Sequence, residues 1–278
     1  MVKSDKMFDM KGKIVLITGG TGLLGFEYAK TLADAGANIV LVDLDEKRCI
    51  KKAEQLEQKY KKSMIGIKTD ISNKNEVKKM ISIIEEKFGR VDVLINNAAF
   101  NCPADQTGSN FVDFKDYPVD LWKKSLNVNL TGMFLCSQEV IRIMLKRKIK
   151  GSIINISSTY GIVGPDQRIY SSIKNPKDKK QVFTKPVDYS TTKSGVLNFT
   201  RYLASLYGKN GIRVNTLSPG GVWDNQDEKF VEKYSNKTVL GHMADKTDYN
   251  GAILFLASDA SRYMTGANLV IDGGWTCW

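Results

Sequence analysis

Short apolar runs alternate with longer amphipathic segments along most of this chain. Residues 14–17 form an apolar run that is too short for a helix, and the segment 26–35 that follows has helical periodicity. The same two patterns recur, with further strands at 38–42, 64–69, 91–95, 152–156, 213–217 and 269–271, and helices at 46–60, 74–88, 119–144, 188–207, 227–234 and 249–257. Strands separated by helices of this length predict an α/β fold with a parallel sheet and right-handed crossovers.

Two further segments lie outside this regular alternation or modify it. Residues 100–118 are irregular and carry three phenylalanines, and a loop of this length is typical of a substrate wall or of a disordered connection. Residues 222–245 are polar, and we predict that they form a mobile substrate lid around the helix at 227–234. No internal linker or repeat separates the elements, so we predict a single domain over residues 1–278.

A basic insertion at residues 164–186 also departs from the α/β pattern. Its cations are Arg168, Lys174, Lys177, Lys179, Lys180 and Lys185. One interpretation is a solvated surface loop. The other is a flap that brings cations over an anionic substrate, because the segment joins Ser158 to Tyr189 and must leave and re-enter the same edge of the sheet. The sequence favours neither interpretation over the other.

The composition narrows the function without fixing it. The net charge of +11 comes from lysines spread in twos and threes over predicted helix surfaces, which indicates a solvated surface rather than a nucleic-acid stripe. Such a basic field would still attract anionic small molecules. The four scattered cysteines (Cys49, Cys102, Cys136 and Cys277) and the single His242 argue against a zinc site and a histidine triad. No run of 18 apolar residues or signal-peptide core is present, so we expect a cytoplasmic protein without metal or membrane span.

A glycine-rich turn follows the first strand and opens the first helix, with glycines at 19, 20, 22 and 25. Glycines let the backbone approach a pyrophosphate, and the helix N-terminus presents free N–H groups to it. Asp43 ends the second strand, where a carboxylate accepts hydrogen bonds from the adenosine ribose and repels a 2′-phosphate. This pattern predicts NAD as the cofactor, with NADP less favoured. Lys47 and Arg48 come next, and we expect them on the helix surface.

Tyr189 and Lys193 stand four residues apart at the start of a predicted long helix. Side chains at positions i and i+4 share a helix face, so the ammonium of Lys193 can approach the phenol of Tyr189. A free tyrosine has a pKa of about 10, and a fixed positive charge favours the phenolate, which makes the hydroxyl a better proton carrier near pH 7. By itself, the spacing is equally compatible with a half-buried aromatic residue and a solvated lysine.

These residues belong to a larger set that resembles the short-chain dehydrogenase/reductase family over nearly the whole chain. The matching features are the glycine-rich turn, Asp43, Asp70, residues 96–99 (Asn-Asn-Ala-Ala), Asn129, Ser158, Tyr189, Lys193, Pro219-Gly220 and residues 272–274 (Asp-Gly-Gly), in the family's order. The resemblance implies a Rossmann-type doubly wound sheet of about seven parallel strands with helices on both faces. It also implies a homodimer or homotetramer.

Carried over residue by residue, the resemblance implies a catalytic role for four residues. Tyr189 would be the general acid/base and Ser158 the donor to the substrate oxygen. Lys193 would lower the pKa of Tyr189 and bind the nicotinamide ribose, and Asn129 would hold a water that links Lys193 to solvent. The implied cofactor contacts are Gly19, Thr21, Gly22, Leu24, Gly25, Asp43, Asp70, Ile71, Asn97, Ala98, Tyr189, Lys193, Pro219, Gly220 and Val222. Plainer roles compete, because Ser158 and Asp70 could be caps and Asn129 a packing amide.

Three features depart from the family pattern. Gly22 and Leu23 stand where the compact members of the family have a residue and a glycine, so the pyrophosphate contacts could differ in detail. Asp224 stands near the position of a frequent threonine, which leaves the nicotinamide carboxamide contact open. Ser158 and Tyr189 are 31 residues apart rather than about a dozen because of the basic insertion.

Within the family, the segments around Ser158, Pro219 and the C-terminus resemble the flagellin modification protein A group. That resemblance implies a phosphorylated or nucleotide-linked sugar substrate from a surface-glycan pathway. We therefore expect an NAD-dependent oxidoreductase that interconverts a secondary alcohol and a ketone. The alternatives are a 3-oxoacyl carrier-protein reductase, against which Asp43 argues, and a non-catalytic NAD-sensing protein, against which the complete catalytic set argues. We expect no nucleic-acid or membrane partner.

Overall fold

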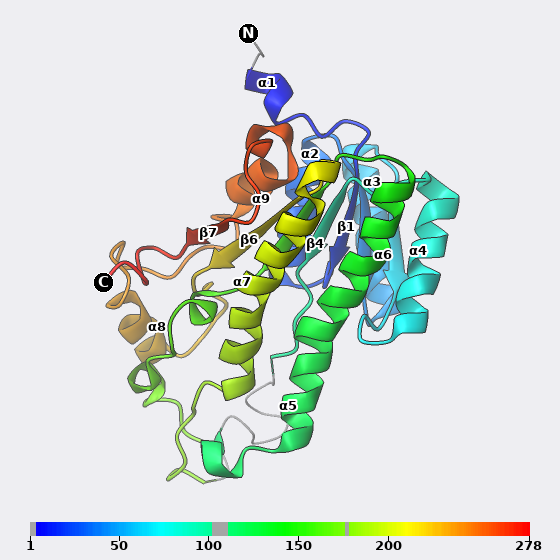
Figure 1. Cartoon of the computed structure of the whole chain (residues 1–278). Helices are drawn as coiled ribbons and strands as arrows, with labels where there is room; N and C mark the ends of the chain where they lie inside the picture. Colours follow the sequence, from blue (N-terminus) through cyan, green and yellow to red (C-terminus); the bar gives the residue numbers. More distant parts are fainter. Residues whose placement is uncertain (1–3, 102–110, 176–177) are drawn as a thin grey trace.

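A seven-stranded parallel sheet forms the centre of the computed structural model, which describes residues 4–101, 111–175 and 178–278 (Figure 1). The strand order is β3-β2-β1-β4-β5-β6-β7. The strands are β1 (Ile14–Thr18), β2 (Asn38–Asp43), β3 (Met64–Lys68), β4 (Val93–Asn96), β5 (Ser152–Ile156), β6 (Arg213–Pro219) and β7 (Asn268–Ile271). The predicted parallel α/β sheet is therefore confirmed, and each strand lies within two residues of its predicted bounds.

Helices cover both faces of this sheet. They are α1 (Ser4–Met7), α2 (Leu23–Asp34), α3 (Glu46–Tyr60), α4 (Lys74–Phe88), α5 (Val119–Leu126), α6 (Met133–Lys146), α7 (Val187–Tyr207), α8 (Glu228–Ser235) and α9 (Asn250–Ala257). Side chains of α4, α6 and α7 pack in one core cluster, and side chains of α2, α3 and α9 pack in another. Figure 1 shows these two groups on opposite sides of the strands.

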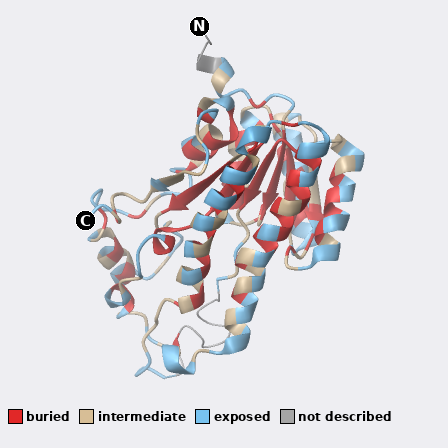
Figure 2. Cartoon of the chain, in the orientation of Figure 1, coloured by how far each residue is buried: buried red, intermediate tan, exposed pale blue. Residues whose placement is uncertain are grey.

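The inner strands β1, β4 and β5 are buried at every position and largely apolar, because both of their faces are covered. In β1, Leu16 packs toward α4 and α6, whereas Val15 and Ile17 pack toward α2 and α9. Strand side chains alternate between faces, so one continuous apolar run supplies both cores. The buried strands are visible as a red band in Figure 2. In the described ranges 4–101, 111–175 and 178–278, no helix has the length and apolar character needed to cross a bilayer.

The predicted helix at 119–144 contains an irregularity. Between α5 and α6, residues Asn127–Gly132 form a π-helical turn, and Asn129 lies in it with 1% of its surface exposed. Single π-helical turns inside α-helices occur frequently at functional sites. The predicted loop at 100–118 includes the short helical turn Phe114–Asp116, while its residues 102–110, including Cys102, lie outside the described part of the chain.

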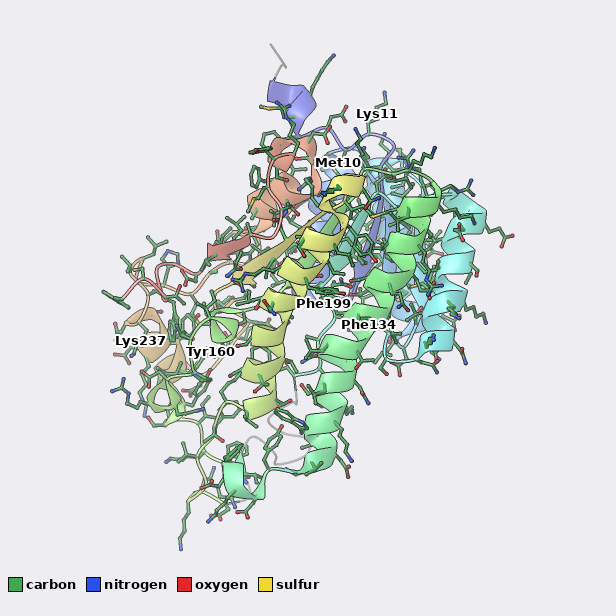
Figure 3. The ribbon with its side chains drawn as sticks, in the orientation of Figure 1. Met10, Lys11, Phe134, Tyr160, Phe199 and Lys237 are labelled. Atoms are coloured by element: carbon green, nitrogen blue, oxygen red, sulfur yellow. The ribbon has the colours of Figure 1, made fainter. Side chains whose placement is uncertain are left out.

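A third core cluster lies beyond the carboxyl ends of β5 and β6. It joins three segments that are distant in sequence: the basic insertion, α8 and the C-terminal tail. Its buried members are Tyr160, Ile169, Tyr170, Phe230, Tyr234, Met243 and Trp275. Figure 3 labels Tyr160 in this lobe and Lys237 after α8. The basic insertion thus has a solvated outer side and an apolar side that is part of a core.

Candidate active site

The glycine-rich turn packs tightly against the end of β4. Gly19 has a φ of +61°, and a Cβ on it would lie 2.8 Å from the Cα of Ala98. A Cβ on Gly25 would lie 2.2 Å from the carbonyl oxygen of Gly19, so both positions require glycine. Gly22, by contrast, has a φ of −70°, and a Cβ there would meet only Gly19 O at 3.3 Å. The departure from the family pattern at Gly22 and Leu23 therefore falls where the backbone is least constrained.

A groove of about 960 Å³ runs from this turn along the carboxyl edge of the sheet. Of the residues assigned to the cofactor from the sequence, it is lined by Gly19, Gly22, Leu24, Asp43, Asp70, Ile71, Asn97 and Ala98. Leu24 belongs to the first turn of α2, so the positive end of that helix dipole faces the groove. Asn97 fixes the wall opposite, because its Nδ2 donates to the carbonyl oxygens of Thr18 and Gly19 at 3.1 and 3.0 Å.

Asp43 is held at the end of β2 by three donors. Its Oδ2 accepts hydrogen bonds from the backbone N and the hydroxyl of Thr21, and its Oδ1 accepts one from the backbone N of Leu44. Thr21 itself does not line the groove but orients the carboxylate that does. Asp70 is fixed in a similar way, since its Oδ1 accepts from both the backbone N and the hydroxyl of Ser72.

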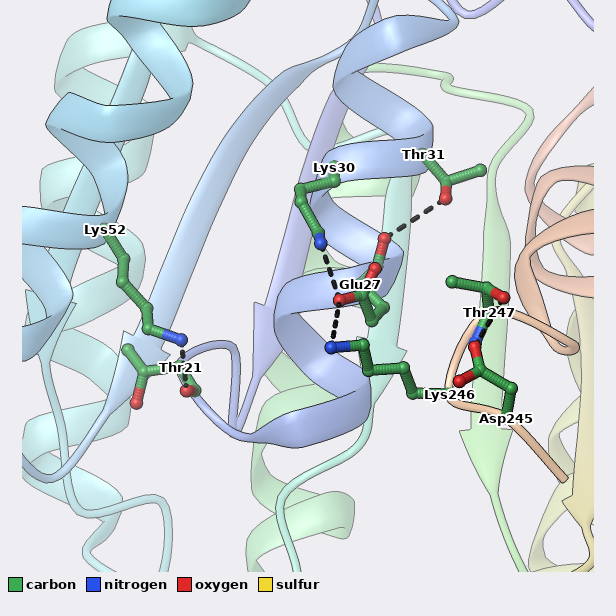
Figure 4. Close-up of polar contacts among 8 residues, drawn as sticks. All are labelled: Thr21, Glu27, Lys30, Thr31, Lys52, Asp245, Lys246 and Thr247. Atoms are coloured by element: carbon green, nitrogen blue, oxygen red, sulfur yellow. Dashed lines mark hydrogen bonds and ion pairs between the residues drawn. The ribbon is translucent and has the colours of Figure 1, made fainter. Parts of the chain in front are cut away.

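Two cations of α3 lie near Asp43. Arg48 is exposed on the helix, as expected, but it also reaches the groove. Its Nη2 lies 2.9 Å from the carbonyl oxygen of Thr21, and the side chain lines the groove. Lys52 donates to the same oxygen at 2.9 Å and lies 3.9 Å from the ring centroid of Phe26 (Figure 4). Burial is the main cause that lowers the pKa of Lys52, and repulsion from Arg48 lowers it further. Lys47 is exposed, as expected.

A second cavity, of about 470 Å³, adjoins the groove and shares Leu24 and Asn97 with it. It contains Ser158, Tyr189 and Lys193, three of the four predicted catalytic residues, together with Pro219, Gly220 and Val222 from the end of β6. The sequence therefore predicted correctly that these distant segments meet. Asp224 is exposed and is not among the lining residues, whereas Gln226, which sequence reasoning did not identify, lines the cavity and donates to Val222 O at 2.8 Å.

Tyr189 differs electrostatically from its expected state. Burial raises the pKa of Tyr189 above its ordinary value, and its hydrogen bond with Ser158 acts in the opposite direction. The expected lowering of the Tyr189 pKa by Lys193 is not observed. Its Nζ donates to the carbonyl oxygen of Ile156 at 2.9 Å and lies 5.9 Å from the centroid of the Tyr189 ring. Lys193 is thus aimed past the ring toward the end of β5.

The lysine that approaches the Tyr189 ring more closely is Lys185. Its Nζ lies 3.9 Å from the ring centroid and donates to Oδ1 of Asn101 at 3.2 Å. Burial lowers the pKa of Lys185 to about 8, partly opposed by Asp188. The pKa of Lys193 is also lowered to about 8, by burial and then by repulsion from Lys185. One signal for this arrangement is present in the sequence, since Lys185 precedes Tyr189 by the same four residues by which Lys193 follows it.

Asn129, the fourth predicted catalytic residue, lies behind the cavity in the π-helical turn. Its Oδ1 accepts from the backbone N of Phe100 at 2.6 Å, and its Nδ2 donates to Phe100 O, Ser125 Oγ and Thr192 Oγ1, each at 3.1 Å. These bonds attach the segment after β4 to α7, the helix that carries Tyr189. Asn129 is not among the residues described as lining either cavity.

Aromatic rings close the outer side of the cavity. The Tyr170 ring contacts Phe183 and Phe230 at centroid distances of 4.9 and 5.3 Å, and Tyr234 stacks on Trp275 at 4.3 Å. Tyr170 and Phe183 come from the basic insertion, and the other three come from α8 and the tail. Sequence reasoning missed this enclosure, because no local pattern indicates that these segments pack together.

Ion pairs hold an inner position of the segment predicted to be a lid and the residue that directly follows it. Lys237, just after α8, pairs with Asp166 of the insertion at 2.5 Å. Lys246 pairs with Glu27 of α2 at 3.7 Å, beside the Glu27–Lys30 pair (Figure 4). Glu27 has 8% of its side chain exposed, so the end of the segment is joined to the helix that borders the cofactor groove.

Two family models match most of the chain. The model described as short chain dehydrogenase matches residues 13–176, and the model described as enoyl-(acyl carrier protein) reductase matches residues 178–276. Among curated relatives, the post-translational flagellin modification protein A of Campylobacter coli is 30% identical over 268 residues. That alignment covers 96% of this chain and 99% of the relative.

Solved structures extend the similarity to the fold. A short chain dehydrogenase from Leptospira borgpetersenii with bound NAD⁺ is 34% identical, with a TM-score of 0.83 and coverage of 99% of this chain and 97% of its own. A gluconate 5-dehydrogenase from Burkholderia cenocepacia, in complex with NADP and tartrate, is 27% identical, with a TM-score of 0.85 and 99% coverage of both chains. Both structures contain a nicotinamide cofactor, NAD⁺ in the first and NADP in the second.

Proposed function

Since the chain belongs to the short-chain dehydrogenase family, and is therefore an NAD(P)-dependent oxidoreductase, we propose that it uses NAD to interconvert a secondary alcohol and a ketone on an anionic sugar derivative. The observation that carries this proposal is the meeting of Ser158, Tyr189 and Lys193 in a cavity that opens onto the cofactor groove through Leu24 and Asn97.

The residues of the groove fit a dinucleotide. The glycine turn and the N-terminal end of α2 suit the pyrophosphate, Asp43 suits the adenosine ribose, and Asp70 with Ile71 suits the adenine. Lys193, Pro219, Gly220 and Val222 would surround the nicotinamide end. Asp43 supports NAD, whereas Arg48 and Lys52 beside it supply the cations that a 2′-phosphate would require. A bound nicotinamide supplies or accepts the hydride.

The protein's side chains would handle the proton. In oxidation, Tyr189 would take the hydroxyl proton of the substrate while the C–H bond releases its electron pair as hydride; in reduction, it would return that proton to the carbonyl oxygen. Ser158, which is hydrogen-bonded to Tyr189, would donate to the same oxygen and stabilise its developing charge. Lys193, whose Nζ donates to the carbonyl oxygen of Ile156, would bind the nicotinamide ribose, and Asn129 would hold the water that connects Lys193 with solvent.

Three observations support an anionic sugar as substrate. Two ammonium groups, those of Lys185 and Lys193, line the cavity. The relatives include a flagellin modification protein and a gluconate dehydrogenase. Gln226 and Ser158 add neutral hydrogen-bonding groups suited to sugar hydroxyls. We extend this to a phosphorylated or nucleotide-linked sugar in surface-glycan biosynthesis, with residues 164–186 and 222–245 as the insertion and lid that enclose it within a single domain.

A second candidate is reduction of a 3-oxoacyl carrier-protein thioester. The match of residues 178–276 to an enoyl-(acyl carrier protein) reductase model favours it, as do Arg48 and Lys52 if they select NADP. For either activity we propose a cytoplasmic homodimer or homotetramer. Its interface would use the exposed apolar residues of α6 and α7, namely Phe134, Leu145, Tyr202 and Leu206.

The test is the variant Tyr189→Phe, which removes the proton-transfer group and leaves the ring. NADH and NADPH are titrated into wild type and variant, and turnover is measured with gluconate, sugar phosphates, nucleotide sugars and a 3-oxoacyl thioester. We expect tighter binding of NADH than NADPH, equal in the two proteins, and a fall in turnover of about 10³-fold or more in the variant. Unchanged turnover would exclude Tyr189 as the acid/base, and tighter NADPH binding with thioester turnover would favour the second candidate.

A further inference from the structure

Lys185 is held in the active site from several sides. Its backbone N donates to Oε1 of Gln167 at 2.9 Å, and its carbonyl oxygen accepts from Nε2 of the same side chain at 3.2 Å. Pro186 follows immediately as the N-cap of α7. The ammonium of Lys185 donates a hydrogen bond to Oδ1 of Asn101 and lies 3.9 Å from the Tyr189 ring centroid. The start and end of the basic insertion therefore converge to direct one cation at the residue that would transfer the proton.

The charge of this cation has no counterpart within the cavity. The described residues that line the cavity include Lys185 and Lys193, but no aspartate or glutamate. The nearest acidic influence on Lys185 is Asp188, which is buried on α7 and accepts a hydrogen bond from Tyr117 at 2.8 Å. Lys185 is half-buried and Lys193 is buried, and charges withdrawn from water are ordinarily paired. Two ammonium groups that repel each other across one tyrosine thus form a site that an anion would stabilise.

The remaining cations of the insertion are arranged differently. Arg168, Lys174, Lys179 and Lys180 are exposed, and Lys177 lies outside the described residues. Arg168 is already paired with Asp166 at 2.8 Å. Among the cations in the described part of the insertion, Lys185 alone lines the active-site cavity. The insertion thus directs a single cation inward.

We infer that Lys185 binds an anionic group of the substrate, a carboxylate or phosphate, carried one or two carbons from the carbon that exchanges the hydride. This inference rests on the proposed function, because Tyr189 fixes where the reacting carbon lies. A charge-assisted hydrogen bond spans about 2.7–2.9 Å, so an anion on Lys185 lies beside the phenol and not at the far end of a long substrate. The inference favours a small sugar acid or sugar phosphate over a sugar whose negative charge is carried only by a distant nucleotide.

The experiment is calorimetric titration of the protein with saturating cofactor. The probes are tartrate, which carries carboxylates next to its carbinol carbons, and glycerol 3-phosphate, with erythritol and glycerol as their neutral counterparts. Wild type is compared with Lys185→Met, with the charge-retaining Lys185→Arg, and with Lys180→Met as a matched control for an exposed lysine of the same segment. Thermal unfolding of each variant confirms that it is folded.

We expect wild type to bind at least one of the anions, and Lys185→Met to bind it at least tenfold more weakly. Lys185→Arg should stay within about threefold of wild type, and Lys180→Met and the neutral probes should show no change. Equal anion binding by wild type and Lys185→Met, or no binding of either anion by wild type, would overturn the inference. Turnover is measured separately. If anion binding depends on Lys185 but no hydride transfer occurs, the proposed function is rejected. If turnover depends on Tyr189 but anion binding does not depend on Lys185, only this inference is rejected.

Discussion

The cofactor groove and the substrate cavity meet at Leu24 and Asn97, yet they are built in different ways. The groove consists mainly of strand ends, a glycine turn and the N-terminus of α2, which the sheet places, with side chains of α3 and α5 along its border. The cavity is enclosed by side chains of the basic insertion, α8 and the C-terminal tail, which meet only in the folded chain. The groove is therefore a property of the fold, and the cavity is a property of this particular sequence.

The electrostatics of the two regions differ in the same sense. Of the groove's lining residues, Asp43 and Arg48 both bond Thr21, and Lys52 beside the groove bonds it as well, so charges of opposite sign lie around one residue. In the cavity, Lys185 and Lys193 lie on either side of one tyrosine without a lining carboxylate. We conclude that positive and negative side chains offset one another near Asp43 in the groove. In the cavity, the positive charges of Lys185 and Lys193 have no lining carboxylate and would be offset by an anionic ligand.

The largest effect that we expect on cofactor binding is that of Gly25→Ala, which tests whether the groove depends on backbone packing. The new Cβ would lie 2.2 Å from Gly19 O, so the turn must shift, and overpacking of this kind costs about 1–3 kcal/mol. We expect NADH affinity to fall at least hundredfold, measured by fluorescence titration. Gly251→Ala on α9 is the matched control, because nothing lies within 4 Å of its added Cβ. Wild-type affinity in Gly25→Ala would show that the close packing is dispensable.

A smaller effect, confined to the other region, is expected for Phe230→Ala. Phe230 is 8% exposed and lies between Tyr170 and Tyr234, with ring centroids at 5.3 and 5.9 Å. Removing it should open the cavity and raise KM for the substrate about tenfold, while Kd for NADH stays within twofold. Phe114→Ala, at a phenylalanine with 75% exposure, serves as the control. An equal loss of cofactor affinity would mean that the two regions are not separable.

The same contrast explains how far the sequence could be interpreted. Glycine turns, strand-end acids and the spacing of Tyr189 and Lys193 are local patterns, and they were sufficient to predict the sheet and the residues that gather at its edge. The pKa of Tyr189 was predicted in the wrong direction, because its burial depends on a cluster that includes Tyr160, Phe230 and Trp275, which are far away in sequence. The sequence places Arg48 on a helix surface and Lys185 in the basic insertion, but it does not show that they reach the groove and the cavity, because the direction of a long side chain is set by its tertiary neighbours.

The smallest expected effect is a pH dependence of stability that separates the cavity from the groove. Burial lowers the folded-state pKa of both Lys185 and Lys193 to about 8, and an unfolded lysine has a pKa of about 10.4. Below pH 8 both states hold the proton and the folded state bears the full cost of the buried charges. Between pH 8 and about 10 the unfolded chain binds more protons than the folded one, so these groups make stability rise with pH.

This contribution is measured as a difference between proteins, because other groups titrate in the same range. Tm is recorded from pH 7 to pH 10 for wild type, Lys185→Met and the exposed control Lys180→Met. Lys185→Met removes one buried ammonium and its repulsion of Lys193, so it should be stabilised relative to wild type most at pH 7, and the difference should shrink toward pH 10. A constant difference across this range would mean that Lys185 is ionised with an ordinary pKa. The absence of a lining carboxylate would then impose no cost, and the cavity would not differ from the groove in its charge balance.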